Sequence, residues 1–449
     1  MEEEIIRIYE LMALMKEHKF PEVKKILGNM NPIDVALLLG EAPEDKLLVL
    51  FRILPKENAT EVFTEMDPEE QETLIKGFTA SEMNNVIEEM FIDDAVDMIE
   101  EMPAVVVNKI LKHANPETRK EINEILKYPE DSAGSVMTTE YMSLKSNLTV
   151  EEAFERIRST GDEKEDIYTC YVIDTNRKLQ GIVTVRDLLL SSKSKIVSEI
   201  METNIISMHT LDDQEAVAKT LAKYDLSTIP ICDAEDRLVG IVTVDDAIDV
   251  LQEENTEDFE KMAAVVPQEK SYFETSVWKH VKNRLPWLYI LMFSSMLTGL
   301  VIEKYEDAFK TMPLLVALMP MLMDTSGNCG SQVSTLIIRG MALDEIKLRD
   351  FFKAMWLEFR VSFIVGCCLG IANGIRVWIQ YHDLSLAIVI GSTLVFCVMI
   401  AKLLGCILPM LAKKMKLDPA IMASPLLTTV TDVTSVLIYF SIATFVMSY

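Results

Sequence analysis

A single carboxylate lies inside a long apolar stretch near the C-terminus. Residues 419–449 contain one charged side chain, Asp432, and no Lys or Arg. A stretch of this length and composition is typical of a membrane-spanning helix. Because an isolated carboxylate is costly in hydrocarbon, we expect Asp432 to face the protein interior or a water-filled path, which predicts a cation pathway. The hydroxyl side chains around it are those of Thr428, Thr429, Thr431, Thr434 and Ser435.

The alternative to a cation pathway is a purely structural ion pair between Asp432 and Lys402. At about 1.5 Å per helical residue and about 30 Å of hydrocarbon, Asp432 would lie about 20 Å from the inner face. The same count places Lys402 only about 3 Å from that face. The difference of about 15 Å in depth argues against a direct pair.

An earlier apolar stretch, residues 311–338, contains the polar run PMLMDTSGNCGSQ. Pro320, Gly327 and Gly330 are expected to loosen a helix and to let two backbones approach closely. A helix-packing motif is the alternative explanation of the two glycines. The residues of this run expected to face a hydrated ion are Asp324, Gly327, Asn328 and Gln332.

Acidic residues recur at helical spacing in the first 262 residues. Asp93 and Asp97 are four residues apart, as are Glu254 and Asp258, so each pair shares a helix face. Like charges at this spacing destabilise a helix mildly, unless a cation neutralises them. A solvated acidic surface that aids solubility is the alternative interpretation.

Charge is distributed unevenly along the chain. Residues 1–270 carry a net charge of −30 and residues 271–449 a net charge of +3, which together make −27. The acidic half argues against nucleic acid as a partner and is compatible with divalent cations. The seven cysteines show neither metal-ligand spacing nor a disulfide framework. The chain has no P-loop, nucleophile elbow or metal-hydrolase spacing, so we expect no enzyme activity.

Residues 1–136 are predicted to form an α-helical superhelical domain. Apolar residues recur at helical spacing, and Pro32, Pro43, Pro55 and Pro68 are each followed by acidic or polar residues. Proline in the first turn with acids beside it is a helix-start signal, so short stacked helices are expected. The N-terminal MEEEIIRIYE is acidic and is not expected to be a signal peptide.

Residues 137–255 contain a tandem repeat. The segment LQGIVTVRD, residues 179–187, recurs as LVGIVTVDD at residues 238–246, with strand-like and helical segments before each copy. This β-α-β-β-α pattern resembles a pair of CBS domains, an α+β regulatory module. In such pairs the Asp after the G-I-V-T strand often holds a nucleotide ribose, which would implicate Asp187 and Asp246, and Arg186 with Asp187 matches the region where some relatives bind ATP. A role in the helix N-cap is the alternative for both aspartates, and metal binding is a further one for Asp246.

Residues 247–270 are predicted to be a linking helix that leads to a transmembrane domain, residues 271–449, with five helices. Lys and Arg set the orientation: the acidic domain is expected in the cytoplasm and the C-terminus outside, in the plasma membrane. The inner side holds Lys279, Lys282, Arg284, Arg339, Lys347, Arg349, Lys353, Arg360, Lys413, Lys414 and Lys416, and the outer side Lys304, Lys310 and Arg376.

The whole pattern resembles the MgtE family of magnesium transporters, over nearly the full chain. The most specific segments are PMLMDTSGNCGSQ with the following IIRG, and SPLLTTVTDVT in the last span. The family usually has a second glycine where Ser326 stands and a small residue at Cys329.

The resemblance implies a homodimeric, Mg²⁺-selective channel in membrane lipid, with Asp432 as the pore aspartate. It also implies that Mg²⁺ bound between the acidic domain, the CBS pair and the linking helix closes the pore, and that ATP binds the CBS pair in some relatives. The acids that match the family's regulatory sites are Asp93, Asp94, Asp97, Asp246, Asp249, Glu254, Glu257 and Asp258.

Two other functions remain open from the sequence. One is a CBS-regulated carrier or exporter of another divalent cation such as Co²⁺, or a Na⁺-coupled Mg²⁺ exporter. The other is a membrane-anchored nucleotide sensor without transport, which would tolerate substitution of Asp432.

Overall fold

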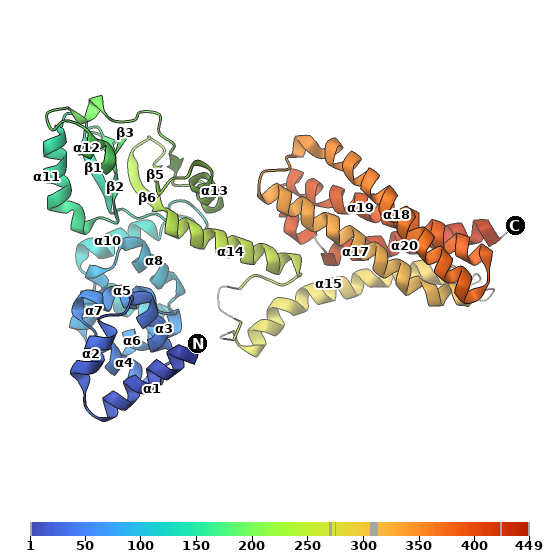
Figure 1. The fold of residues 1–449 in the computed structure, drawn as a ribbon, viewed down its shortest axis with the longest axis horizontal. Coiled ribbons are helices and arrows are strands. Elements are labelled where there is room, and N and C mark those ends of the chain that lie inside the picture. Colours follow the sequence, from blue (N-terminus) through green and yellow to red (C-terminus); the bar gives the residue numbers. More distant parts are fainter. Residues whose placement is uncertain (1, 269–271, 274, 306–312, 423, 448–449) are drawn as a thin grey trace. The chain divides into compact units, whose positions relative to one another are not determined.

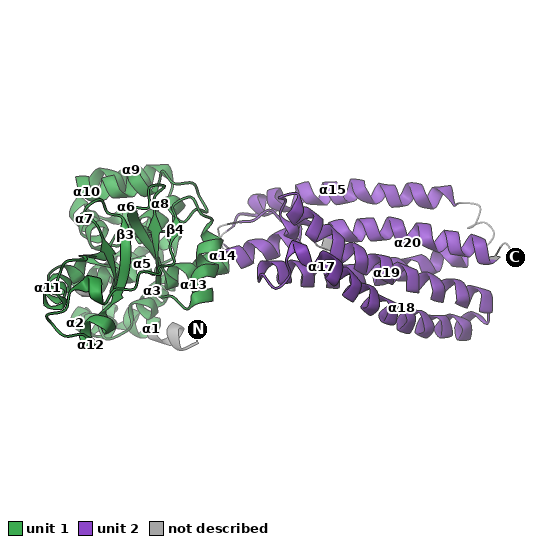
Figure 2. Cartoon of the chain, turned by 90° about the horizontal axis from the view of Figure 1, so that it is seen from above, with its two compact units in different colours: residues 1–252 green, residues 253–449 purple. Residues whose placement is uncertain are grey.

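A computed structural model of the chain describes residues 2–268, 272–273, 275–305, 313–422 and 424–447 (Figure 1). The chain divides into two compact units, residues 1–252 and 253–449 (Figure 2). Hydrophobic cores form separately in each unit. Lys310, counted above on the outer side, and Thr311, the predicted start of the second span, lie outside the described residues.

The first part of unit 1 is an array of short helices, as predicted. Pro32 and Pro68 are the first residues of helices, while Pro43 and Pro55 are N-caps. The helices are α1 (Glu2–Lys16), α2 (Phe20–Leu27), α3 (Pro32–Gly40), α4 (Glu44–Ile53), α5 (Lys56–Thr64), α6 (Pro68–Gly77), α7 (Ala80–Glu89), α8 (Ile92–Glu101), α9 (Ala104–His113) and α10 (Pro116–Ile125).

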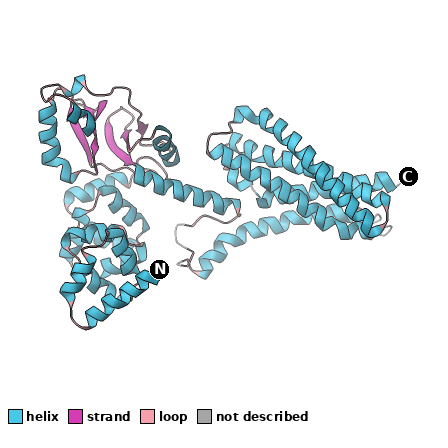
Figure 3. Ribbon diagram, viewed as in Figure 1, coloured by secondary structure: helices cyan, strands magenta, loops and turns pink. Residues whose placement is uncertain are grey.

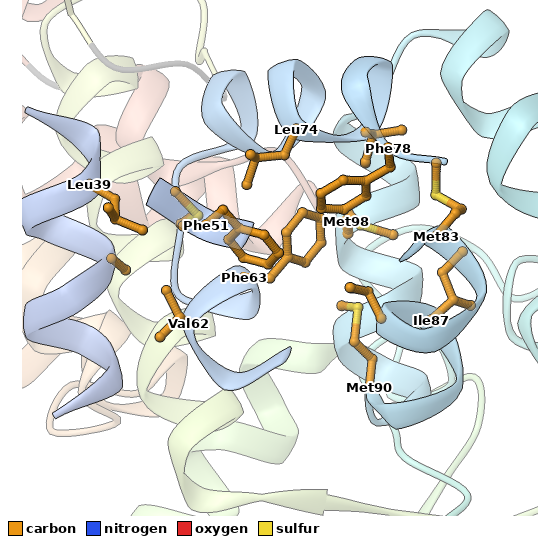
Figure 4. Packing of buried hydrophobic residues seen from close by; sticks show 14 of the residues in the cluster. Leu39, Phe51, Val62, Phe63, Leu74, Phe78, Met83, Ile87, Met90 and Met98 are labelled. Carbon is orange, nitrogen blue, oxygen red and sulfur yellow. The ribbon is translucent and has the colours of Figure 1, made fainter. Parts of the chain in front are cut away.

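One continuous apolar core joins these helices. Successive helices are too short to be stable alone, so packing of their apolar faces must hold the array together. Phe51, Phe63 and Phe78 lie at its centre, with ring centroids 5.4 to 6.1 Å apart (Figure 4).

The rest of unit 1 is an α+β tandem repeat with two three-stranded sheets (Figure 3). In each repeat the first strand pairs in parallel with the second, which pairs antiparallel with the third. The first repeat contains β1 (Tyr141–Lys145), α11 (Val150–Thr160), the short 3₁₀ helix η1 (Gly161–Glu163), β2 (Asp166–Ile173), β3 (Leu179–Thr184) and α12 (Val185–Leu190), followed by η2 (Val197–Glu199). The second contains β4 (Met208–His209), α13 (Gln214–Tyr224), β5 (Thr228–Cys232), β6 (Leu238–Thr243) and α14 (Val244–Met262).

The two repeats exchange backbone hydrogen bonds. Thr138, which opens the first repeat, exchanges N–H···O bonds of 2.9 Å with Ile241 in the second. Ile182 and Glu202 form the equivalent pair, at 2.9 and 2.8 Å. The glycine of each G-I-V-T strand permits this approach, since a Cβ at Gly240 would lie 2.7 Å from the Thr138 carbonyl oxygen. The recurring sequence therefore encodes an interlocked pair.

Unit 2 contains long helices that run lengthwise beside one another (Figure 2). Glycines permit the closest crossings: a Cβ at Gly405 would collide with the carbonyl oxygen of Gly330 on the neighbouring helix. The helices are α15 (Val277–Lys304), α17 (Leu314–Ala342), η3 (Leu348–Asp350), α18 (Phe351–Tyr381), α19 (Leu384–Lys414), η4 (Pro419–Met422) and α20 (Ser424–Met447).

Among the described residues, four of the five predicted spans are long and apolar enough to cross a membrane, namely α15, η3–α18, α19 and η4–α20. The polar run lowers the hydropathy of α17, the remaining one. That helix packs against α19 and α20, so much of its surface contacts protein, which tolerates the polar residues. The last apolar stretch is not one continuous helix, because η4 precedes α20.

We expect Gly240→Ala to destabilise unit 1 by about 1–3 kcal/mol, because the added methyl must displace backbone. The measurement is thermal unfolding of the full chain in detergent. Gly299→Ala is the control, since a Cβ there meets nothing within 4 Å. Equal unfolding temperatures for Gly240→Ala and wild type would show that the interlock is not tight.

Candidate functional site

Asp432 lies on α20, where this helix packs against α17 and α19. It is half-buried, and no ion pair with a cation involves it among the residues that the structure describes. Asp324 of α17 is near enough to repel it electrostatically. Two neighbouring carboxylates without a basic partner form a site that favours a cation.

The hydroxyls around Asp432 are oriented by the helix itself. Thr428 and Thr429 donate to the Pro425 carbonyl at 2.9 and 3.2 Å, and Thr431 donates to the Thr428 carbonyl at 2.9 Å. With the protons engaged, the oxygen lone pairs of these side chains can only accept. Thr428 and Thr429, which are partly exposed, can therefore receive hydrogen bonds from the waters of a hydrated cation, whereas Thr431 is buried.

The residues predicted on α17 occupy two faces of that helix. Gly327 is buried at the crossing with α20, where a Cβ would lie 2.7 Å from Thr428 Cγ2. Ser326 on the same face shares a 2.7 Å hydrogen bond with Ser435. The other face is exposed: it carries Asp324, Asn328 and Gln332, and Asn328 Nδ2 donates to Asp324 Oδ2 at 3.3 Å.

A second site is an acidic cluster in unit 1, where the helical array meets the CBS pair. Asp93 on α8 is buried, and Asp246 at the start of α14 and Glu165 before β2 lie near enough to repel it. Burial, followed by these charges, raises the pKa of Asp93 well above its ordinary value. Burial, followed by the charge of Asp246, raises the pKa of Asp94 to about 6, and burial, followed by the charges of Asp94 and Asp246, raises that of Glu165 to about 8.

Hydrogen bonds hold parts of this cluster in place. Glu140 Oε2 accepts from the Ile92 N–H at the start of α8, at 3.0 Å, which joins the two halves of unit 1. Asp246 accepts from the Thr243 hydroxyl. Glu165 Oε2, in contrast, is buried and has no hydrogen-bond partner among the described residues. The carboxylates of the cluster therefore repel one another when they are ionised, and a cation bound among them would relieve this repulsion.

Sequence reasoning found Asp93, Asp94 and Asp246 but missed Glu140 and Glu165. Nothing in their spacing marks them, because the fold alone brings them to α8 and α14. Asp249 also belongs here: its pKa is raised by burial and by Asp245, and it acts on Glu65 at the end of α5.

The other predicted acids lie elsewhere. Asp97 is exposed on α8, and Glu254, Glu257 and Asp258 lie on the part of α14 that belongs to unit 2. Glu257 pairs with Lys261 at 2.6 Å, and the same ammonium pairs with Asp418, just before η4, at 2.8 Å. No group of three or more His, Cys, Asp or Glu side chains in the described ranges is arranged to hold a metal ion directly.

The predicted nucleotide residues lie at α12. Asp187 accepts from the Thr184 hydroxyl at 2.5 Å, and Thr184 in turn accepts from the Asp187 N–H at 3.1 Å. Thr184 is thus the N-cap of α12, and Asp187 completes the capping box from the N3 position. The N-cap role considered for Asp187 therefore belongs to Thr184. Arg186 is exposed.

Three family models match the chain in order. The MgtE intracellular N domain matches residues 30–131, the CBS domain matches residues 133–193 and 197–253, and the divalent cation transporter model of MgtE matches residues 319–442. Together with the apolar helices, these matches define a membrane transporter with a CBS-containing cytosolic part.

Proteins of similar sequence identify the family to which this membrane transporter belongs. The magnesium transporter MgtE of Thermus thermophilus is 34% identical over 437 residues, covering 96% of this chain and 97% of its own. The Bacillus subtilis MgtE is 32% identical, with coverages of 97% and 96%. The chain therefore belongs to the MgtE family of magnesium transporters, which are transporters rather than enzymes.

A solved structure agrees for the cytosolic part. The crystal structure of the cytosolic domain of the Mg²⁺ channel MgtE in complex with ATP has a TM-score of 0.52 and 34% sequence identity. The matched region covers 54% of this chain and 99% of the chain in that crystal structure.

The acidic cluster predicts a pH dependence. Because folding raises these pKa values, ionisation destabilises the folded state, and stability falls as pH rises from about 4 through 8. We expect Glu165→Gln to lessen the fall in unfolding temperature between pH 5 and pH 8, measured on the full chain in detergent with a chelator present. Glu155→Gln, at an exposed position on α11, is the control. A Glu165→Gln variant less stable than wild type at pH 8 would contradict this account.

Proposed function

We propose that the protein is a Mg²⁺-selective channel for Mg²⁺ uptake, which intracellular Mg²⁺ closes by binding the acidic residues of its cytosolic part. The observation that supports conduction is Asp432, a half-buried carboxylate without a cationic partner among the described residues. Mg²⁺ retains its waters in such sites and is bound by one or two carboxylates. A homodimer would place two Asp432 side chains around one ion, with the C-terminus outside the cell.

Selectivity then rests on the hydration shell. The hydroxyl oxygens of Thr428 and Thr429 accept hydrogen bonds, and an ion that keeps its waters presents donors to them. Such a site selects by the size and shape of the octahedral hydration shell rather than by the radius of the bare ion. This kind of selection favours Mg²⁺ over larger cations.

Closure is supported by the acidic cluster. Two unit charges 4 Å apart repel by about 1 kcal/mol in water and about 4 kcal/mol at an effective dielectric constant of 20. Several such pairs amount to the few kcal/mol that shift a two-state equilibrium. The donor set is all oxygen, as Mg²⁺ prefers, and the unpartnered Glu165 Oε2 fits a cation held through water.

Contacts within unit 2 connect the linking helix to the candidate pore helices. Lys261 of α14 pairs with Asp418, whose other carboxylate oxygen accepts from the Ala420 N–H at 2.8 Å in η4, immediately before α20. Arg339 at the end of α17 donates to Asn255 of α14 at 3.2 Å. A movement of α14 would thus reach the helices that carry Asp432 and Asp324.

ATP binding remains a proposal for the CBS pair. It rests on the related cytosolic domain that was crystallised with ATP. Arg186 is exposed and suited to a phosphate, while one carboxylate oxygen of Asp187 is already engaged by Thr184.

Asp432→Asn is expected to abolish or greatly reduce Mg²⁺ flux into proteoliposomes, because the pore would lose its negative charge. Asp344→Asn, at an exposed position after α17, is the control. Wild-type flux in Asp432→Asn would remove the pore assignment. Flux of Co²⁺ in preference to Mg²⁺ in the wild type would favour a carrier of another cation.

Neutralising Asp249, Glu254 and Asp258 together is expected to weaken Mg²⁺-dependent closure, because fewer carboxylates remain to be bridged. The measurement is the Mg²⁺ concentration that protects the cytosolic part from proteolysis in the full chain. Neutralising the exposed Glu41, Glu155 and Asp162 is the charge-matched control. Protection at the wild-type concentration in the first triple variant would count against Mg²⁺ gating through these residues.

A further inference from the structure

An open cavity of about 790 Å³ lies between α17, α18 and α19 in unit 2, lined by polar side chains together with the apolar Val333, Leu336 and Val361. It is separate from the hydroxyl groups around Asp432 and is bounded by three helices that all carry polar side chains into it. These side chains are Asn328, Ser331, Gln332 and Thr335 from α17, Glu358 from α18 and Lys402 from α19.

Two opposite charges line this cavity, and neither has a role in the site described above. Lys402 is only 6% exposed. Glu358 Oε2 is buried and lacks a hydrogen-bond partner among the described residues, although Lys402 is near enough to attract it. Ionisable groups inside a membrane domain are costly and mark ion pathways more often than structure.

We propose that this cavity is a second binding station for the transported cation, in which Glu358 and the oxygens of α17 hold hydrated Mg²⁺. Lys402 neutralises the carboxylate when no ion is present and competes with the ion for it. The inference rests on the proposed Mg²⁺ conduction and adds a site to it.

The size and chemistry of the cavity fit this ligand. Six waters of about 30 Å³ each occupy about 180 Å³, so a fully hydrated Mg²⁺ can enter. One carboxylate suits an ion that keeps most of its waters, and the amide and hydroxyl oxygens accept hydrogen bonds from them. A competing ammonium keeps binding weak, as conduction requires, because an ion that binds too tightly does not leave.

Polar side chains extend beyond the cavity along the exposed face of α17. Gln332, Asn328 and Asp324 follow one another at four-residue spacing, and Asn328 donates to Asp324. Asp324 in turn acts electrostatically on Asp432. A polar row thus leads from the proposed station to the candidate pore carboxylate.

The test is the Mg²⁺ dependence of flux for the full chain in proteoliposomes. Glu358→Gln is expected to raise the half-saturating Mg²⁺ concentration by about threefold to tenfold, because the carboxylate is lost. Lys402→Gln is expected to lower it, because the competitor is lost. In the double variant, the effect of Lys402→Gln should disappear, since no carboxylate remains to be contested. Glu345→Gln and Lys353→Gln, at exposed positions, are the matched controls, and thermal unfolding in detergent monitors folding.

The opposite changes in half-saturating Mg²⁺ concentration expected for the two single variants distinguish this proposal from a purely structural ion pair. If Glu358 and Lys402 only stabilise the fold, both single variants should lose flux and stability together, and the double variant should recover them. That pattern, or unchanged half-saturation in both single variants, would overturn the station while leaving wild-type conduction intact. Absence of Mg²⁺ flux in the wild type would instead overturn the proposed function, and the station with it.

Discussion

Carboxylates held near one another, with at least one of them partly or fully buried, are the constraint on which the rest of this structure depends. Asp93, Glu165 and Asp246 form such a group in unit 1, and Asp432 with Asp324 forms another in unit 2. In unit 1, desolvation and mutual repulsion both disfavour the ionised forms, and in unit 2 the two carboxylates repel each other. A divalent cation removes both penalties, because it supplies opposite charge without needing a preformed cage when it keeps its waters. The same interaction therefore underlies both proposed sites, the one for conduction and the one for regulation.

Close backbone packing is what brings these groups together. Gly240 lets the two CBS repeats interlock, and the interlocked pair presents Glu140 to α8. Gly327 and Gly330 let α17 lie against α20 and α19. These crossings position one polar face of α17 toward the neighbouring helices and leave the other face, with Asn328 and Gln332, beside a cavity. The packing explanation therefore applies to Gly327 and Gly330, while for Asp324, Asn328 and Gln332 on the other face the ion-facing role stays a prediction.

Hydrogen bonds within α20 decide which hydrogen-bonding groups the hydroxyl-rich segment can offer. Thr428, Thr429 and Thr431 donate to carbonyls of their own helix, which leaves their oxygens as acceptors, and of these three side chains Thr428 and Thr429 are partly exposed whereas Thr431 is buried. Such a surface suits the donor-rich shell of a hydrated cation and offers nothing to an anion. Lys261 pairs with Asp418 and Arg339 donates to Asn255, and these contacts join α14 to the other helices of unit 2.

The sequence by itself determined the architecture and the family. Apolar periodicity, proline starts, the G-I-V-T repeat and long apolar runs each depend on neighbours in the chain, so the helical array, the CBS pair and most of the spans were predictable. The prediction that Asp432 is a pore residue also comes from the sequence, because a lone charge in an apolar run is visible without coordinates, and it stays a prediction. Only the tertiary structure decided that Glu140 and Glu165 join Asp93, that Asp187 completes a cap, and that Glu358 and Lys402 share a cavity. These pairings join residues that are distant in sequence, and their energy depends on burial and separation, which the packing of the whole chain sets.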